Sequence, residues 1–151
     1  MSRSRLLLTV LAGAAFFLAS QAWGAWSSIT VRNGSHITVG YIDSDGTLRG
    51  SSHSTIGYVD SDGTVRNSSH STIGYVDSGG TVRDNSRSTL GYVDVDGTLR
   101  NASSSTIGYL DDCTWRDSSR GTSGYFDGCS PSDWQAMAGW VFFMTAQSRS
   151  E

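Results

Sequence analysis

The feature that most limits how this chain can fold is a unit of 17 residues that returns along most of its length. One copy, residues 57–73, reads GYVDSDGTVRNSSHSTI. Self-similarity at a fixed period is the signature of a repeat architecture, in which one supersecondary unit packs against its copies. The Gly-Tyr step that opens each copy recurs at Gly40, Gly57, Gly74, Gly91, Gly108 and Gly124.

One copy of the repeat is predicted to fold as a β-hairpin. Residues 55–60 alternate and are rich in strand-forming types, and the pattern resumes at residues 63–66. The intervening Asp-Ser-Asp-Gly, residues 60–63, suits a type I turn followed by a glycine in the left-handed region. A polar connector, residues 67–71, leads to the next copy.

The hairpin register places aromatic and basic side chains opposite each other on one face. Val59 faces Val65, and Tyr58 faces Arg66 on the other side. A guanidinium can lie over a phenol ring in that position. Repetition predicts a multivalent aromatic and basic surface, hereafter the Tyr/Arg face. Its candidate ligand-binding residues are Tyr41, Tyr58, Tyr75, Tyr92, Arg49, Arg66, Arg83 and Arg100.

The two ends of the repeat array each carry half a unit. Residues 30–33 read as a return strand, and residues 124–127 read as an outgoing strand. Because a lone hairpin is marginal in water, the units must pack on one another. We therefore expect an all-β fold of tandem 17-residue hairpins around a pseudo-symmetry axis, with the termini completing one hairpin between them. The alternative is an open β-solenoid with about 17 residues per coil.

The repeat also resembles a known family. The units GYIDSDGTLRGSSHSTI and GYVDSDGTVRNSSHSTI, with a C-terminal stretch containing Trp-Gln-Ala-Met-Ala and Phe-Phe, resemble the bacterial five-fold β-flower repeat proteins. The resemblance covers roughly residues 30–144 and implies short hairpins arranged around an axis, without implying an activity. This chain departs from that pattern in its two cysteines and its extra half-unit, which leaves five or six units open.

The N-terminus predicts export. Two arginines precede an apolar run, residues 6–19, and small residues follow around Ala22 and Gly24. This order is typical of a cleaved signal peptide, and the run is short for a membrane span. We expect residues 1–24 to be removed. Residues 26–146 would then form one domain, with repeats near 40–123 and a closing half-unit and apolar cap at 124–146. The mature protein is predicted to be periplasmic or secreted.

The last units depart from the pattern. Cys113 and Cys129 each lie two residues after a repeat aspartate, so in an exported protein we expect them to form a disulfide between adjacent turns. Residues 130–133, Ser-Pro-Ser-Asp, are a helix-start signal. We expect one short helical turn that leads into an apolar strand at residues 139–144. The aromatic side chains of this segment are predicted to fill the centre of the array, and the alternative is that they form a binding or membrane-touching surface; they are Trp134, Trp140, Phe142 and Phe143.

Charge and motif analysis argue against nucleic-acid binding and against a metal site. The net charge is −3 and the arginines are evenly spaced, so no basic patch indicates nucleic-acid binding. Turn chemistry accounts for the repeated aspartates, which lack the length and closing glutamate of an EF-hand. A row of His36, His53 and His70 continues as Arg87, Ser104 and Arg120, which are poor metal ligands. We therefore expect neither a metal nor a cofactor.

These observations predict a non-enzymatic binding or structural protein of the bacterial envelope. No serine is marked as an activated nucleophile. An enzyme would need one asymmetric pocket at the degenerate end, near Trp115 and Trp134. The partner expected for the Tyr/Arg face is an envelope glycan, an anionic polymer or an envelope protein, bound through many weak contacts. The alternative is a periplasmic protein that binds a metal or small ligand through its Asp-Ser-Asp-Gly turns or its histidine row.

Overall fold

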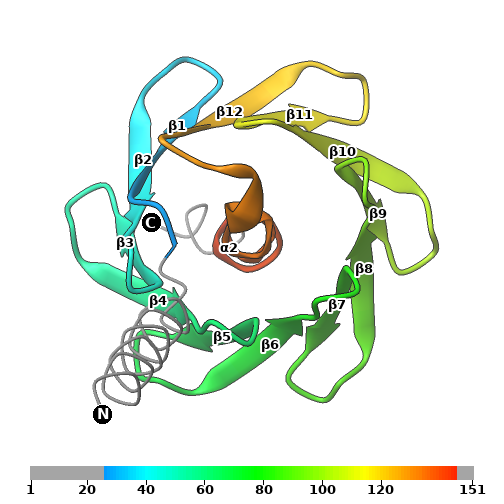
Figure 1. Cartoon of the computed structure of the whole chain (residues 1–151), viewed down its shortest axis with the longest axis horizontal. Helices are drawn as coiled ribbons and strands as arrows, with labels where there is room; N and C mark the ends of the chain where they lie inside the picture. Colours follow the sequence, from blue (N-terminus) through cyan, green and yellow to red (C-terminus); the bar gives the residue numbers. More distant parts are fainter. Residues whose placement is uncertain (1–25, 146–151) are drawn as a thin grey trace, which may run out of the picture.

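The structure, a computed structural model, describes residues 26–145 and is a closed antiparallel barrel around a central helical segment (Figure 1). The predicted signal peptide lies outside the described residues. Within residues 26–145 the strands are β1 (Ile29–Asn33), β2 (Thr38–Ile42), β3 (Thr47–Gly50), β4 (Thr55–Val59), β5 (Thr64–Asn67), β6 (Thr72–Val76), β7 (Thr81–Asp84), β8 (Thr89–Val93), β9 (Thr98–Asn101), β10 (Thr106–Asp111), β11 (Thr114–Asp117) and β12 (Thr122–Asp127).

The predicted hairpin and its register are confirmed. Strand β4 pairs with β5 so that Tyr58 lies opposite Arg66 and Val59 opposite Val65. Gly63 has a φ of +85°, the left-handed conformation expected at the end of the turn. The valines are buried in the barrel, whereas Tyr58 and Arg66 are half-buried on the outer face. The solenoid alternative is not needed.

Ring closure is also confirmed. Strand β1 pairs with β12, with Val31 opposite Phe126 and Arg32 opposite Tyr125. The two half-units thus form a sixth unit beside the five continuous hairpins of the described chain. Closure leaves no strand edge with unpaired backbone groups in the barrel wall.

The connectors between units are tight turns. Asn67 Oδ1 accepts hydrogen bonds from the backbone N–H groups of Ser69 and Ser71, both at 3.0 Å. His70 then adopts the left-handed conformation with a φ of 62°. The connectors splay outward around the ring (Figure 1). The Asp-Ser-Asp-Gly turns lie at the opposite ends of the strands and surround one opening, which we call the turn mouth.

The C-terminal segment fills the barrel as a plug, residues 131–144. It comprises a 3₁₀ turn η1 (Pro131–Asp133), helix α2 (Trp134–Gly139) and a π-helical turn η2 (Trp140–Met144). The predicted helix start is confirmed, but the predicted apolar strand at residues 139–144 is wrong. The closed wall offers no free edge to a further strand. Backbone groups inside an apolar barrel must therefore bond within their own segment, as in a helix.

The prediction that the C-terminal aromatic side chains fill the centre is confirmed, and the repeat glycines make room for them. A Cβ at Gly40 would lie 2.2 Å from Cη2 of Trp140, and one at Gly74 would lie 2.4 Å from Cε1 of Phe143. Phe142 lies against Gly91 in the same way. Each repeat glycine therefore serves as a docking position for a side chain in the core.

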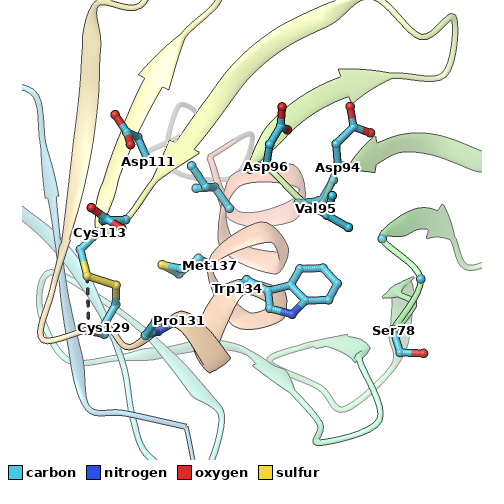
Figure 2. Close-up of a pocket in the computed structure, with 16 residues that line it drawn as sticks. Ser78, Asp94, Val95, Asp96, Asp111, Cys113, Cys129, Pro131, Trp134 and Met137 are labelled. Carbon is cyan, nitrogen blue, oxygen red and sulfur yellow. Dashed lines mark hydrogen bonds between the residues drawn. A yellow bond between two sulfur atoms is a disulfide. The ribbon is translucent and has the colours of Figure 1, made fainter.

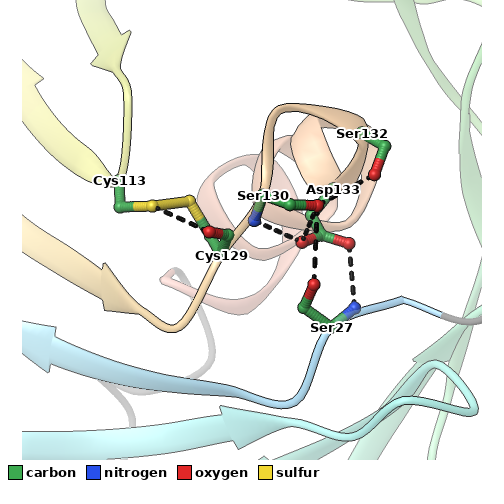
Figure 3. Close-up of a disulfide and its surroundings, with 6 residues drawn as sticks. All are labelled: Ser27, Cys113, Cys129, Ser130, Ser132 and Asp133. Atoms are coloured by element: carbon green, nitrogen blue, oxygen red, sulfur yellow. Dashed lines mark hydrogen bonds between the residues drawn. A yellow bond between two sulfur atoms is a disulfide. The ribbon is translucent and has the colours of Figure 1, made fainter.

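Two contacts fix the start of the plug (Figure 3). The predicted disulfide is confirmed, with 5.8 Å between the Cα atoms of Cys113 and Cys129. The buried carboxylate of Asp133 accepts hydrogen bonds from the N–H of Ser27 at 2.9 Å and of Ser130 at 2.7 Å. These bonds tie the chain before β1 to the plug. In the part of the chain that the structure describes, no helix has the length and apolar character needed to cross a membrane.

Candidate functional site

The arginines of the predicted Tyr/Arg face are held in ion pairs. The Nε of Arg66 lies 2.8 Å from Asp60 Oδ2, and the Nη1 of Arg66 donates to the carbonyl oxygen of His70 at 3.4 Å. The hydrogen bond and charge of Asp60 raise the pKa of Arg66. The same ion pair recurs around the barrel as Arg32–Asp127, Arg49–Asp43, Arg83–Asp77, Arg100–Asp94 and Arg116–Asp111. Each of these arginines therefore has a structural role, because its side chain is held by the aspartate of a neighbouring turn or strand end.

The tyrosines of this face are covered by the connectors, except Tyr92, whose connector carries Ser104 at the stacking position. His70 stacks on Tyr58 with 4.3 Å between the ring centroids, and Arg87 lies 4.1 Å above the ring of Tyr75. The cation–π contacts that the structure gives thus come from the left-handed connector position and not from the cross-strand arginine that we predicted. The other pairs of this kind are His36–Tyr125, His53–Tyr41 and Arg120–Tyr109.

The histidine row does not converge. His36, His53 and His70 each stack on a different tyrosine around the ring. Among residues 26–145, no three His, Cys, Asp or Glu side chains gather as a metal site. The structure therefore gives these histidines a stacking role.

A cavity of about 610 Å³ opens at the turn mouth, between the plug and one side of the wall. We call it the mouth pocket. It is lined by the turns at residues 78–80, 94–97 and 111–113, by Val93 and Leu110 of the wall, by Cys129, and by residues 131, 134 and 137 of the plug. In Figure 2, Trp134 and Met137 project from the plug toward the space beneath Val95 and Asp96. Solvent can therefore enter the barrel at one side of the turn mouth, whereas the plug fills the rest of the interior.

The pocket exists because side chains occupy the repeated turn positions on one side of the mouth and leave the same positions open on the other side. Val59 N–H donates to Gly46 O, and the carbonyl oxygen of Val59 accepts a hydrogen bond from Trp26 Nε1 at 3.2 Å. One unit on, Val76 N–H donates to Gly63 O, and Val76 O accepts from Gln135 Nε2 at 2.9 Å. We call each such glycine and carbonyl a carbonyl subsite.

The next two carbonyl subsites open into the pocket. Val93 N–H donates to Gly80 O at 2.7 Å and Leu110 N–H donates to Gly97 O at 2.8 Å, so the backbone frame is the same. No side chain of residues 26–145 donates to the carbonyl oxygen of Val93 or of Leu110. Both side chains are 8% exposed, against 0–1% for Val59 and Val76. Apolar surface that is covered elsewhere in the ring is therefore accessible here.

The rim of the pocket is acidic. The lining includes Asp94, Asp96, Asp111 and Asp112 and contains no basic residue. Asp94 and Asp111 are paired with arginines on the outer face. The N–H of Thr98, which donates to Asp96 Oδ1 at 2.9 Å, lowers the pKa of Asp96, so this carboxyl is ionised at neutral pH.

The residues that form this pocket were mostly missed by the sequence analysis. Trp134 was named for an asymmetric pocket at the degenerate end, and it does line the cavity, whereas Trp115 does not. One signal was available, because Val95 stands where the other turns carry Ser44, Ser61 and Ser78. Val95 is fully exposed. An apolar residue in place of a repeated serine marked the open side of the mouth.

Comparison with protein families gave one match, and comparison with curated proteins and with solved structures gave none. The model of the 5-fold beta-flower protein family matches residues 28–144, which span every strand and the plug of the described fold. That description names an architecture and no activity. By its repeat, its closed ring of hairpins and this match, the chain belongs to the 5-fold beta-flower protein family.

Proposed function

We propose that this protein is an exported, non-enzymatic binding protein that holds a small ligand in the mouth pocket. The proposal rests on an interruption of the repeat at the turn mouth, where only some of the equivalent carbonyl subsites are filled. Four carbonyl subsites share one backbone frame, two are filled by Trp26 and Gln135, and two open into the cavity. A volume of about 610 Å³ lies in the range of pockets that hold small molecules.

The character of the lining supports binding. Trp134, Met137, Val93 and Leu110 supply an apolar floor. Ion pairs fix the rim carboxylates of Asp94 and Asp111, and a turn hydrogen bond fixes that of Asp96. Apolar walls with a few fixed polar groups are typical of ligand sites.

The compartment proposed is the bacterial envelope or the medium outside it. Support comes from the signal-peptide pattern of residues 1–24 and from the disulfide at the pocket wall, a bond that persists in oxidising compartments. The turns that line the pocket occupy the repeat position of the Asp-Ser-Asp-Gly turns named in the small-ligand alternative of the sequence analysis, but their own sequences depart from it, as in Asp-Val-Asp-Gly at residues 94–97. Binding of a glycan or an anionic polymer by the Tyr/Arg face stays a prediction. It has less support, because the arginines of that face are paired with aspartates.

A matched pair of variants tests the pocket. Val93→Phe should fill the floor, and the barrel tolerates phenylalanine at this repeat position because Phe126 occupies it in the last unit. Val93→Leu, the residue of the neighbouring unit, is the control. We expect compounds from a fragment library to raise the thermal midpoint of the native protein and of Val93→Leu, but not of Val93→Phe. Equal shifts in all three proteins, or no shift in any, would contradict a ligand site in the pocket.

A further inference from the structure

We propose, on the basis of the pocket function above, that the ligand is a small organic cation in which an apolar or aromatic body carries N–H donor groups. The chain itself shows which chemistry suits a carbonyl subsite. The groups that occupy two of these subsites are an indole N–H and a primary amide N–H, each donated to the backbone carbonyl oxygen of a repeat valine.

The two open subsites would be satisfied by N–H donors of a bound ligand. The carbonyl oxygens of Val93 and Leu110 are acceptors in an equivalent frame, so a ligand that enters must bring donors to use them. A ligand rich in acceptors, such as a carboxylate or phosphate, would face these oxygens without a hydrogen bond. Burying an unpaired polar group in this way costs about 1–3 kcal/mol, which corresponds to a tenfold loss of affinity for each 1.4 kcal/mol.

The negative charge of the rim also favours a cationic ligand. Arg100 and Arg116 are paired with Asp94 and Asp111, while Asp96 and Asp112 have no basic partner among the ion pairs of the described chain. Opposite unit charges attract by about 1 kcal/mol at 4 Å even in bulk water, and by more where protein excludes water. The rim therefore favours a cation over a neutral isostere and disfavours an anion.

The remaining surface selects an apolar body. Met137 and Trp134 face the cavity from the plug, and the fully exposed Val95 stands at its entrance (Figure 2). An indole side chain already packs at the equivalent position near Gly46, where Trp26 Nε1 would lie 3.2 Å from an added Cβ. A flat ring with an attached amine thus matches both the floor and the rim.

The test uses a pair of probes that differ in charge on one ring. Tryptamine carries an ammonium group on an indole, and indole-3-acetate carries a carboxylate on the same ring. Isothermal titration of the disulfide-bonded protein should show binding of tryptamine that is at least about tenfold tighter than that of indole-3-acetate. Raising the salt concentration should reduce the difference in affinity between the two indoles, because salt screens charges at a rim that is exposed to solvent.

Replacing rim aspartates by asparagine tests whether their charge causes the preference for a cation. Asp96→Asn keeps the oxygen that accepts from Thr98, and Asp112→Asn suits the left-handed φ of 52° at that position. The double variant should bind tryptamine about fivefold to tenfold more weakly. The control is the double variant Asp45→Asn and Asp62→Asn, which removes equivalent turn charges at the filled subsites. Its affinity should equal that of the native protein.

The outcomes separate this inference from the pocket itself. Equal binding of both indoles, abolished by Val93→Phe, would keep the pocket and refute the preference for cations. A tryptophan- or arginine-containing peptide that binds where tryptamine does not would assign the pocket to a chain segment and refute a small-molecule ligand. Absence of binding by either indole, together with a fragment screen that shifts no midpoint, would refute both proposals.

Discussion

Replacing Asp133 by alanine should destabilise the protein more than the loss of any turn aspartate. The Asp133 carboxylate is 1% exposed and accepts from Ser27 N–H, Ser130 N–H and Ser130 Oγ–H, the last at 3.0 Å. A net hydrogen bond to a charged group contributes about 1.5–3 kcal/mol, and its loss leaves the half-buried N–H groups of Ser27 and Ser130 without that partner. Because the three bonds act together, we expect a total cost of about 3–5 kcal/mol. That is a large share of the roughly 5–15 kcal/mol typical of a domain.

The pH dependence of this contribution follows from the pKa. Burial raises the pKa of Asp133, but the hydrogen bonds from Ser27 and Ser130 outweigh burial and hold the pKa below its ordinary value. A carboxyl group with a lowered folded-state pKa stabilises the fold above its unfolded pKa of about 3.9 and loses that stabilisation as the pH falls through the folded value. The stability difference between the native protein and Asp133→Asn should therefore shrink from about pH 7 toward about pH 2.

The assay is guanidinium unfolding of the native protein, Asp133→Ala and Asp133→Asn across that pH range. Asp62→Ala is the matched control, since Asp62 accepts one backbone hydrogen bond, from Thr64, in an exposed turn. It should cost about 1 kcal/mol. A cost for Asp133→Ala that is no larger than that of the control would refute the anchoring role of Asp133. So would a difference between native and Asp133→Asn that stays constant with pH.

Three further predictions concern other parts of the ring. Reducing the Cys113–Cys129 disulfide, or replacing both cysteines by serine, should lower the free energy of unfolding by about 3 kcal/mol, measured by denaturant titration with and without reductant. Gly79→Asp should stabilise the protein by about 0.5–1 kcal/mol, seen as a higher thermal midpoint. A Cβ at Gly79 meets nothing within 4 Å, and the other turns use an aspartate there to accept from the threonine two residues on. Arg66→Gln should cost no more than about 1 kcal/mol and should leave tryptamine affinity unchanged by calorimetry, because its ion pair lies on the outer face.

The sequence predicted those parts of the fold that depend on local chemistry and on period. Alternation of residue types defined the hairpin, and the Asp-Ser-Asp-Gly turn defined its register, so Tyr58 could be placed opposite Arg66 before the structure was known. Half-units at both ends predicted the pairing of β1 with β12. The equivalent positions of Cys113 and Cys129 in adjacent turns predicted their bond.

Features that depend on the whole ring were not predictable in the same way. The apolar run at residues 139–144 has strand-like composition, and only the absence of a free edge in the closed wall makes it helical. The stacking of His70 on Tyr58 depends on the left-handed connector, which a polar sequence such as Asn-Ser-Ser-His does not reveal by itself. The pocket depends on how far Trp26 and Gln135 reach around the mouth, and this is set by the entry points of two distant segments.

The most direct test of the pocket is a map of backbone amide shifts on titration with tryptamine. The repeat supplies its own control, because Gly46, Gly63, Gly80 and Gly97 occupy equivalent turns. We predict that the amide signals of Gly80, Gly97 and Val95 move and saturate together while those of Gly46 and Gly63 stay in place. Equal movement of all four glycines would place binding on all the repeated turns alike and contradict a site confined to the two open subsites.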